Sequence, residues 1–243
     1  MNAVTKYYQH ATALLAKTFE DEEQNILDAA QLLTDSCLQG GRIYVFGSGH
    51  SHIMAEEVYG RAGGLALIKA ILPQELMVID FPTKSTGIER LSGYSQSLIE
   101  LYKLDEKDTI VIISNSGRNA VPVEMAQAAR DKGAKVIALT SLAHSKATTS
   151  RAPSGKRLFE LADVVIDNHA PKGDAILEVE GCNTPTGPVS DFLGIFIMDA
   201  MMTQVIEDIA KTGIQPPVFV SSNVDGGDET NRHLYDTYYG YWK

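Results

Sequence analysis

Five short aliphatic runs constrain the fold of this 243-residue chain more than any other feature. They are rich in Val and Ile, do not alternate with polar residues, and are mostly separated by stretches with a helical pattern. Strands of this kind are buried on both faces, which is typical of a parallel sheet with helices on its two sides. We therefore predict one doubly wound α/β domain with strands at Ile43–Phe46, Leu65–Ile68, Thr109–Ile113, Val136–Leu139 and Val164–Ile166.

The segment before the first strand is predicted to be helical. Residues 4–38 read as two helices joined around Glu20–Glu23, and they form an N-terminal helical extension over residues 1–40. Between the third and fourth strands, a helix is predicted over 122–132. Gly133 follows it and suits the left-handed position that often ends a helix.

The C-terminal part divides into one long helix and an aromatic tail. The helix is predicted from about Pro188 to Lys211, where a glycine and two prolines follow. The tail, residues 216–243, is too polar for a core and too aromatic for plain disorder. We expect it to pack on its own domain or on a partner subunit through the aromatic residues Tyr235, Tyr238, Tyr239, Tyr241 and Trp242.

The charge balance argues against two classes of partner. The chain carries 21 Lys and Arg residues against 31 Asp and Glu residues, a net charge of −10. Because nucleic acids and anionic membranes bind positive surfaces, we expect neither as a partner. The sequence also lacks a secretory apolar segment and any apolar run of roughly 18 residues, so we expect a cytoplasmic protein.

Two loops rich in small polar residues follow the first and third strands. One is Gly47-Ser48-Gly49-His50-Ser51, and the other contains Ser114, Asn115, Ser116 and Asn119. A strand that passes into a helix through such a loop directs main-chain N–H groups and short hydroxyls toward one point, which favours an anion. Two such loops predict a small phosphorylated ligand held between them.

Nucleotide and metal sites are not predicted. A Rossmann fingerprint needs a third glycine, where this chain has His52, and an acidic residue roughly 20 positions later. A Walker A loop needs Gly-Lys followed by Ser or Thr, which is also absent. His50 and His52 are interpreted as hydrogen-bonding groups within their loop, because no second ligand stands at metal-binding spacing. We predict no cofactor and no metal.

Glu57 is a candidate general base on the helix after the first loop. At about 100° per residue, Ile53, Met54 and Val58 define one arc of that helix, and Glu57 falls inside it. A carboxylate on the inward face near an anion loop suits proton transfer. The alternative is an ion pair with Arg61 four residues later, which shares the arc.

The two loops in register resemble those of the SIS (sugar isomerase) domain family, over roughly residues 40–210. The most specific stretch runs from Ile113 through Gly117 to Thr140. This resemblance implies a three-layer αβα sandwich with a five-stranded parallel sheet in flavodoxin-like order, in a domain over 41–215. It also implies a phosphosugar site completed across the interface of a homodimer or a dimer of dimers.

The resemblance also implies roles for individual residues. Ser114 and Ser116 would hold the phosphate, with Asn119 where many members have Thr, and the loop from Ser48 to Ser51 would contact the sugar. We expect Thr140 and Ser141, just past the fourth strand, to add hydroxyls to the same crevice.

The segment Ala55–Arg61 resembles the Ala-Glu-Glu stretch and Gly-Arg of bacterial phosphoheptose isomerases, which makes Glu57 the base. Ile53 stands where those enzymes have a zinc-binding His. His169 and His233 are the candidates for a second acid or base. The segment Thr184–Ser190 resembles a loop of N-acetylmuramic acid 6-phosphate etherases.

Three functions follow from these resemblances. The first is an aldose–ketose isomerase acting on a sugar phosphate. The second is a lyase or etherase acting on an N-acetylated amino-sugar phosphate, and the third is a phosphosugar sensor without catalysis. The sequence leaves all three open.

Overall fold

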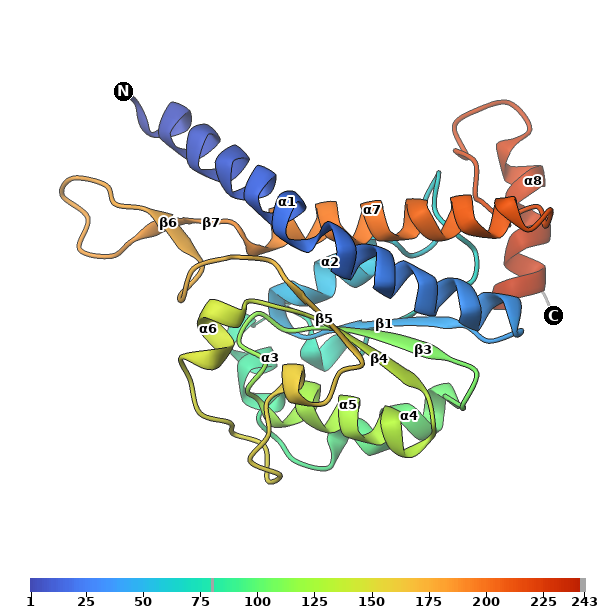
Figure 1. Cartoon of the computed structure of the whole chain (residues 1–243), viewed down its shortest axis with the longest axis horizontal. Helices are drawn as coiled ribbons and strands as arrows, with labels where there is room; N and C mark the ends of the chain where they lie inside the picture. The colour runs from blue at the N-terminus through green and yellow to red at the C-terminus, as the bar shows by residue number, and fades with distance from the viewer. Residues whose placement is uncertain (80, 241–243) are drawn as a thin grey trace.

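The predicted strands form one parallel sheet in the computed structural model, which describes residues 1–79 and 81–240 (Figure 1). The strand order is β2-β1-β3-β4-β5, and every neighbouring pair is parallel. This is the flavodoxin-like order that was expected. The strands are β1 Ile43–Gly47, β2 Ile68–Ile71, β3 Thr109–Ile113, β4 Lys135–Thr140 and β5 Val164–Asp167.

Helices cover both faces of the sheet and complete the three layers. On one side lie α1, α2 and α7, and on the other lie α3, α4 and α5 (Figure 1). The helices of the described chain are α1 Ala3–Leu38, α2 His52–Glu57, α3 Pro82–Ile88, α4 Tyr94–Tyr102, α5 Ala120–Asp131, α6 Leu142–Lys146, α7 Ser190–Lys211 and α8 Gly227–Leu234.

The strands supply side chains to two cores because successive residues of a strand point to opposite faces. In β3, Val111 and Ile113 join the core beneath α1, α2 and α7. Ile110 and Ile112 join the core beneath α4 and α5. All four residues are buried, as the absence of polar alternation in the sequence predicted.

The prediction of two N-terminal helices was wrong, because α1 is continuous from Ala3 to Leu38. The acidic run Glu20–Glu23 does not break it, since Glu is a good helix former and the run holds no Gly or Pro. Glu22 is buried, and its carboxylate accepts the main-chain N–H of Asp167 at 3.1 Å. The acidic run therefore ties α1 to the end of β5.

The second strand lies three residues later than predicted. Leu65 forms an antiparallel bridge with Val218, and the Ala66 N–H donates to the Pro217 carbonyl at 2.8 Å. Leu65 and Ala66, at the start of the apolar run, therefore pair with the C-terminal tail, and β2 begins at Ile68.

The described part of the tail lies against its own domain. Lys69 donates to the Tyr238 carbonyl at 2.6 Å, and its ammonium lies 4.4 Å from the centre of the Tyr239 ring. Tyr241 and Trp242, which were expected to contribute to this packing, fall outside the described residues.

A short hairpin projects from the body beside the first half of α1 (Figure 1). It consists of β6 Ala175–Leu177 and β7 Thr186–Pro188, which pair antiparallel. The Tyr7 hydroxyl donates to the Pro188 carbonyl at 2.7 Å and fastens the hairpin to α1. Over the described ranges, no helix is both long and apolar enough to cross a membrane.

Candidate functional site

A cleft of about 480 Å³ opens at the carboxyl edge of the sheet, where ligands bind in open α/β folds. The loops after β1 and β3 form two of its walls, and α3 with α6 form the others. The cleft brings together the residues predicted in both loops, and it adds others that were not predicted. Its lining comprises Ser48, Gly49, His50, Ser51, Val78, Pro82, Thr83, Ser85, Thr86, Glu89, Ser114, Asn115, Ser116, Asn119 and His144.

The first loop folds so tightly that only glycine fits at position 47. A Cβ on Gly47 would lie 2.3 Å from the Ser51 carbonyl oxygen, closer than atoms can approach. Gly49 has a φ of +60°, in the left-handed region. The His52 ring bonds to the Gly49 carbonyl, which matches the interpretation of His52 as a loop-stabilising residue. The tight turn holds Ser48, His50 and Ser51 on the cleft wall.

The second loop presents hydroxyl groups at the start of α5. The Ser114 hydroxyl accepts the Gly117 N–H at 3.2 Å, whereas Ser116 forms no hydrogen bond with any other described residue. Asn119 stands at the N-cap position of α5 with an extended backbone. The positive end of the helix dipole therefore lies next to the Ser116 hydroxyl, an arrangement that favours an anionic group.

Glu89, at the C-terminal end of α3, is the residue that the sequence interpretation missed. Its carboxylate accepts the Ser48 hydroxyl at 2.9 Å and the Asn119 side-chain amide at 2.7 Å, so it joins the two loops. Burial raises the pKa of Glu89, while the hydrogen bond from Ser48 and the charges of Arg90 and Arg151 oppose that change. The sequence held one signal for Glu89. The helix dipole disfavours a carboxylate at the C-terminal end of a helix, so a Glu at such a position indicates that other groups stabilise its charge.

His144, in α6, is a second cleft residue that was not predicted. Its Nδ1 is buried without a hydrogen-bond partner in the described chain. Desolvation, with the charges of Lys172 and Arg118, lowers the pKa of His144, so its imidazole is neutral at pH 7. Its place shortly after β4, close behind the polar pair Thr140 and Ser141, was the signal that could have identified it.

Thr140 and Ser141 do not line the cleft, although they follow the neighbouring strand. Both side chains are fully buried. Thr140 donates to the Ser114 carbonyl at 2.7 Å, and Ser141 donates to the Ala170 carbonyl at 2.6 Å. In this arrangement their hydroxyls support the walls of the cleft, and they do not face a ligand.

Glu57 also lies away from the cleft lining of its own chain. It forms an ion pair with Arg61, the alternative that the helical spacing left open. Arg61 borders a separate cavity of about 190 Å³ between the loop after α2 and α7. The role of Glu57 in catalysis stays a prediction.

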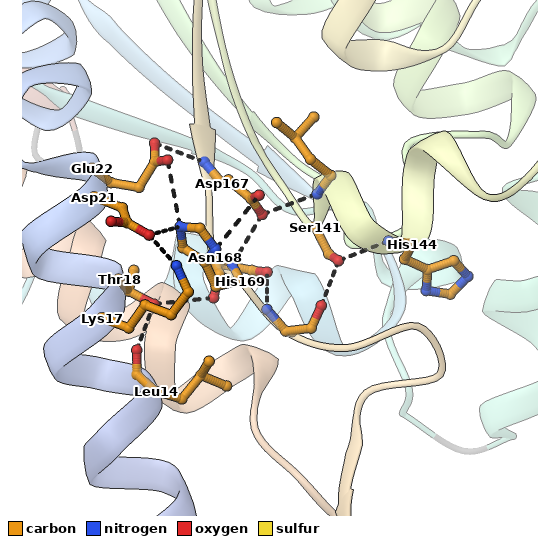
Figure 2. A network of polar contacts seen from close by, with 12 residues as sticks. Leu14, Lys17, Thr18, Asp21, Glu22, Ser141, His144, Asp167, Asn168 and His169 are labelled. Carbon is orange, nitrogen blue, oxygen red and sulfur yellow. Dashed lines mark hydrogen bonds and ion pairs between the residues drawn. The ribbon is translucent and has the colours of Figure 1, made fainter.

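His169 belongs to a polar network between α1 and β5 (Figure 2). Its Nε2 lies 3.6 Å from both Asp21 and Glu22, and its Nδ1 lies 3.8 Å from Asp167. The adjacent Asn168 donates to the Asn115 side chain at 3.1 Å, so the network supports the second loop from behind.

His233 lies on the exposed side of α8, away from the cleft. Within the part of the chain that the structure describes, no three His, Cys, Asp or Glu residues gather closely enough to hold a metal ion.

A comparison with known proteins identifies the family. The SIS domain model matches residues 6–141, more than half of the chain. The chain belongs to the SIS domain family. The match begins within α1 and ends just after β4, so it includes most of the helical extension and four of the five strands of the sheet.

This chain is similar, over nearly its whole length, to several UPF0309 proteins. One, from Halalkalibacterium halodurans, is 49% identical over 237 residues, which cover 98% of each chain. Another, from Geobacillus kaustophilus, is 39% identical over 235 residues, or 97% of this chain and 94% of the relative.

Solved SIS-type structures share the fold at low identity. Phosphoheptose isomerase GmhA from Neisseria gonorrhoeae has a TM-score of 0.57 and 18% identity, covering 84% of this chain and 97% of the other. The Vibrio vulnificus NanR protein complexed with ManNAc-6P has a TM-score of 0.54 and 15% identity, covering 97% of this chain and 70% of the other.

Proposed function

We propose that the cleft binds a sugar phosphate and that the protein is an aldose–ketose isomerase. One observation carries the proposal: Glu89, a half-buried carboxylate, shares a single cleft with two hydroxyl-bearing loops. Family membership supports the ligand class, because a related fold is a phosphoheptose isomerase and another was solved with ManNAc-6P. We expect this activity to be cytoplasmic.

The phosphate is assigned to the second loop. Ser116 has a hydroxyl with no partner among the described residues, and Ser114 lies beside it at the end of β3. The first turn of α5 supplies the positive end of a helix dipole. The sugar then extends toward Ser48, His50 and Ser51 on the opposite wall.

Glu89 is assigned the transfer of a proton between carbons. It removes the proton from C2 of the aldose while the carbonyl oxygen at C1 gains one, which gives an enediol. It then returns a proton to C1 while the hydroxyl at C2 loses its own, which gives the ketose. A pKa raised by burial suits this role, because the group must both accept and release a proton near neutral pH.

His144 is assigned the transfer of a proton between the two oxygens. A neutral imidazole can donate at one nitrogen and accept at the other, and the buried Nδ1 of His144 is without a hydrogen-bond partner in the described chain. Its lowered pKa keeps it neutral. The proton removed from one oxygen is thus delivered to the other, and the overall charge does not change.

Glu57, His169 and His233 remain candidates for a site built by two chains. None of them lines the cleft of its own chain, so a chemical role requires the cleft of a second copy. We propose a homodimer or a dimer of dimers on this ground.

Solvent exchange tests the proposed reaction. The protein is incubated in D₂O with a panel of aldose and ketose phosphates, and ¹H NMR follows the loss of the C2 proton of each aldose and of a C1 proton of each ketose. We expect exchange and isomerisation for at least one sugar. Glu89→Gln should retain binding and lose exchange, whereas Ser116→Ala should weaken binding by about tenfold, the value of one charge-assisted hydrogen bond. Absence of both binding and exchange across the panel would contradict the proposal.

A non-catalytic sensor is the second candidate. Both oxygens of Glu89 already accept hydrogen bonds, from Ser48 and Asn119, so the carboxylate could serve only to brace the two loops. A thermal shift with a sugar phosphate, without exchange at C2, would favour the sensor. Release of lactate from an N-acetylated amino-sugar phosphate would favour the lyase.

A further inference from the structure

Three arginines lie next to residues that line the cleft, although none of the three lines it. Arg90 follows Glu89 in the sequence, Arg118 precedes Asn119, and Arg151 lies on the loop after α6. The Arg151 N–H donates to the Arg118 carbonyl at 2.7 Å, so the two backbones run side by side. The Val121 N–H donates to the Glu89 carbonyl at 3.0 Å and brings the end of α3 to the same place.

The carboxylate of Glu89 partly offsets the charge of this triad from a distance, since it interacts with Arg90 and Arg151. No carboxylate lies within 4 Å of any of the three guanidinium groups over residues 1–79 and 81–240. Desolvation is the first cause that lowers the pKa of Arg151; the charges of Arg118 and Arg90 add to it, and the charge of Glu89 opposes it. Such a cluster is unusual in a chain whose net charge is −10, and it favours an anion.

Two of the three side chains are already held in position. Arg118 donates from Nε to the Thr149 carbonyl at 2.8 Å. Arg151 donates from Nη1 to the Asn119 side-chain oxygen at 3.1 Å. The loop that carries Arg151 is itself fastened, because the Leu158 N–H donates to the Gly117 carbonyl at 2.8 Å. A ligand would lose little side-chain entropy in binding groups fixed in advance.

Asn119 connects the triad to the cleft. Its oxygen accepts from Arg151, and its amide donates to Glu89 at 2.7 Å on the cleft side. We propose that Arg90, Arg118 and Arg151 form a second anion subsite at the cleft rim, so that the ligand is a sugar phosphate with a second anionic group. This inference rests on the proposed function, because it names the substrate class of the same cleft.

The binding test compares three probes that differ in their second group. Fructose 6-phosphate has none, fructose 1,6-bisphosphate carries a phosphate, and 6-phosphogluconate carries a carboxylate. We expect the wild type to bind at least one doubly anionic probe at least about tenfold more tightly than the monophosphate. One additional charged hydrogen bond changes the affinity by about this factor. Whichever is preferred identifies the group.

Substitutions then separate the triad from the cleft. Arg151→Gln and Arg118→Gln should remove the preference for the doubly anionic probe and leave the affinity for the monophosphate within about twofold. Lys156→Gln is the matched control, because it removes the same charge from the same loop outside the triad. Equal losses for all probes in the arginine variants, or no loss for any, would overturn the second subsite.

A tungstate soak of protein crystals gives an outcome that does not depend on the sugar. We expect one anomalous peak at Ser114 and Ser116 and a second between the arginines, with only the second lost in Arg151→Gln. A peak at the serines alone overturns the second subsite and leaves the proposed function standing. A peak at the arginines alone contradicts the phosphate assignment, and no peak at either position overturns both.

Discussion

Glu57 and Glu89 occupy equivalent local positions and have different surroundings. Each stands at the C-terminal end of a short helix, where the helix dipole disfavours a carboxylate. The negative charge of Glu57 is offset by an ion pair with Arg61, one turn later and at the surface. Glu89 is compensated by Ser48 and Asn119, which come from two other loops and enclose it.

The difference shows that local helical geometry does not distinguish a carboxylate that lines the cleft from one that forms a surface ion pair. A partner four residues away on the same helix stabilises a surface charge and needs no tertiary structure. Glu89 is partly buried among distant loops, and this burial raises its pKa, while the hydrogen bond from Ser48 opposes the change. The second arrangement is the one that prepares a group for proton transfer.

The largest expected effect is on exchange at C2 of the sugar. Glu89→Gln should slow it by about 10²- to 10⁴-fold, the usual contribution of a general base, without changing the fold. Glu57→Gln is the matched substitution, and in the same NMR assay it should alter the rate by no more than about threefold if its role is structural. The reverse ranking would restore Glu57 as the base and place it in the cleft of a second copy.

The next effect is on the free energy of unfolding, through substitutions of one glycine in α7 and one in α3. A Cβ on Gly194 of α7 would lie 2.0 Å from the Met54 sulfur of α2, so Gly194→Ala should lower the free energy of unfolding by about 1–3 kcal/mol. Gly87 of α3 has no atom within 4 Å of such a Cβ. Gly87→Ala should raise stability by up to about 1 kcal/mol through helix propensity.

Urea denaturation of both glycine variants measures this contrast. Equal changes for the two would mean that the helix bearing Glu57 is no more tightly packed than the helix before Glu89.

A pH dependence should distinguish the two carboxylates. Burial raises the pKa of Glu89 above its ordinary value of 4.5, so the folded state holds the proton more tightly than the unfolded state. The stabilisation is complete below the ordinary value and is lost as pH rises through the raised pKa. Wild type should therefore lose stability relative to Glu89→Gln as the pH rises from below 4.5 through the raised pKa of Glu89. Parallel pH profiles in urea denaturation would mean that Glu89 is not desolvated.

The smallest expected effect is on the stability contributed by the surface pair. The side chains of Glu57 and Arg61 are 27% and 49% exposed. Such a pair contributes about 0–1 kcal/mol, and salt screens it. Arg61→Ala should lower the midpoint of urea unfolding only slightly at low salt and not at high salt. A large loss that persists in high salt would mean that Arg61 has a further role, in the cavity between the loop after α2 and α7.

The fold was predictable because its signal is local. Aliphatic runs without alternation indicate strands buried on both faces, and β1, β3, β4 and β5 lie within two residues of their predicted positions. The second strand was displaced because Leu65 pairs with Val218, which is 153 positions later. The two loops were predictable for the same reason, since strand ends and small polar residues are visible in the sequence.

The sequence alone determined the order of buried strands, the parallel sheet, and the two polar loops at its carboxyl edge, because each depends on the residues of one short segment. Only the tertiary structure decided which polar groups face the cleft. Ser116 forms no hydrogen bond within the described residues, while Ser141 donates to the Ala170 carbonyl, although both follow neighbouring strands. Glu89 reaches Ser48 across 41 positions. Desolvation and hydrogen bonding at a site are set by segments that meet only when the chain has folded.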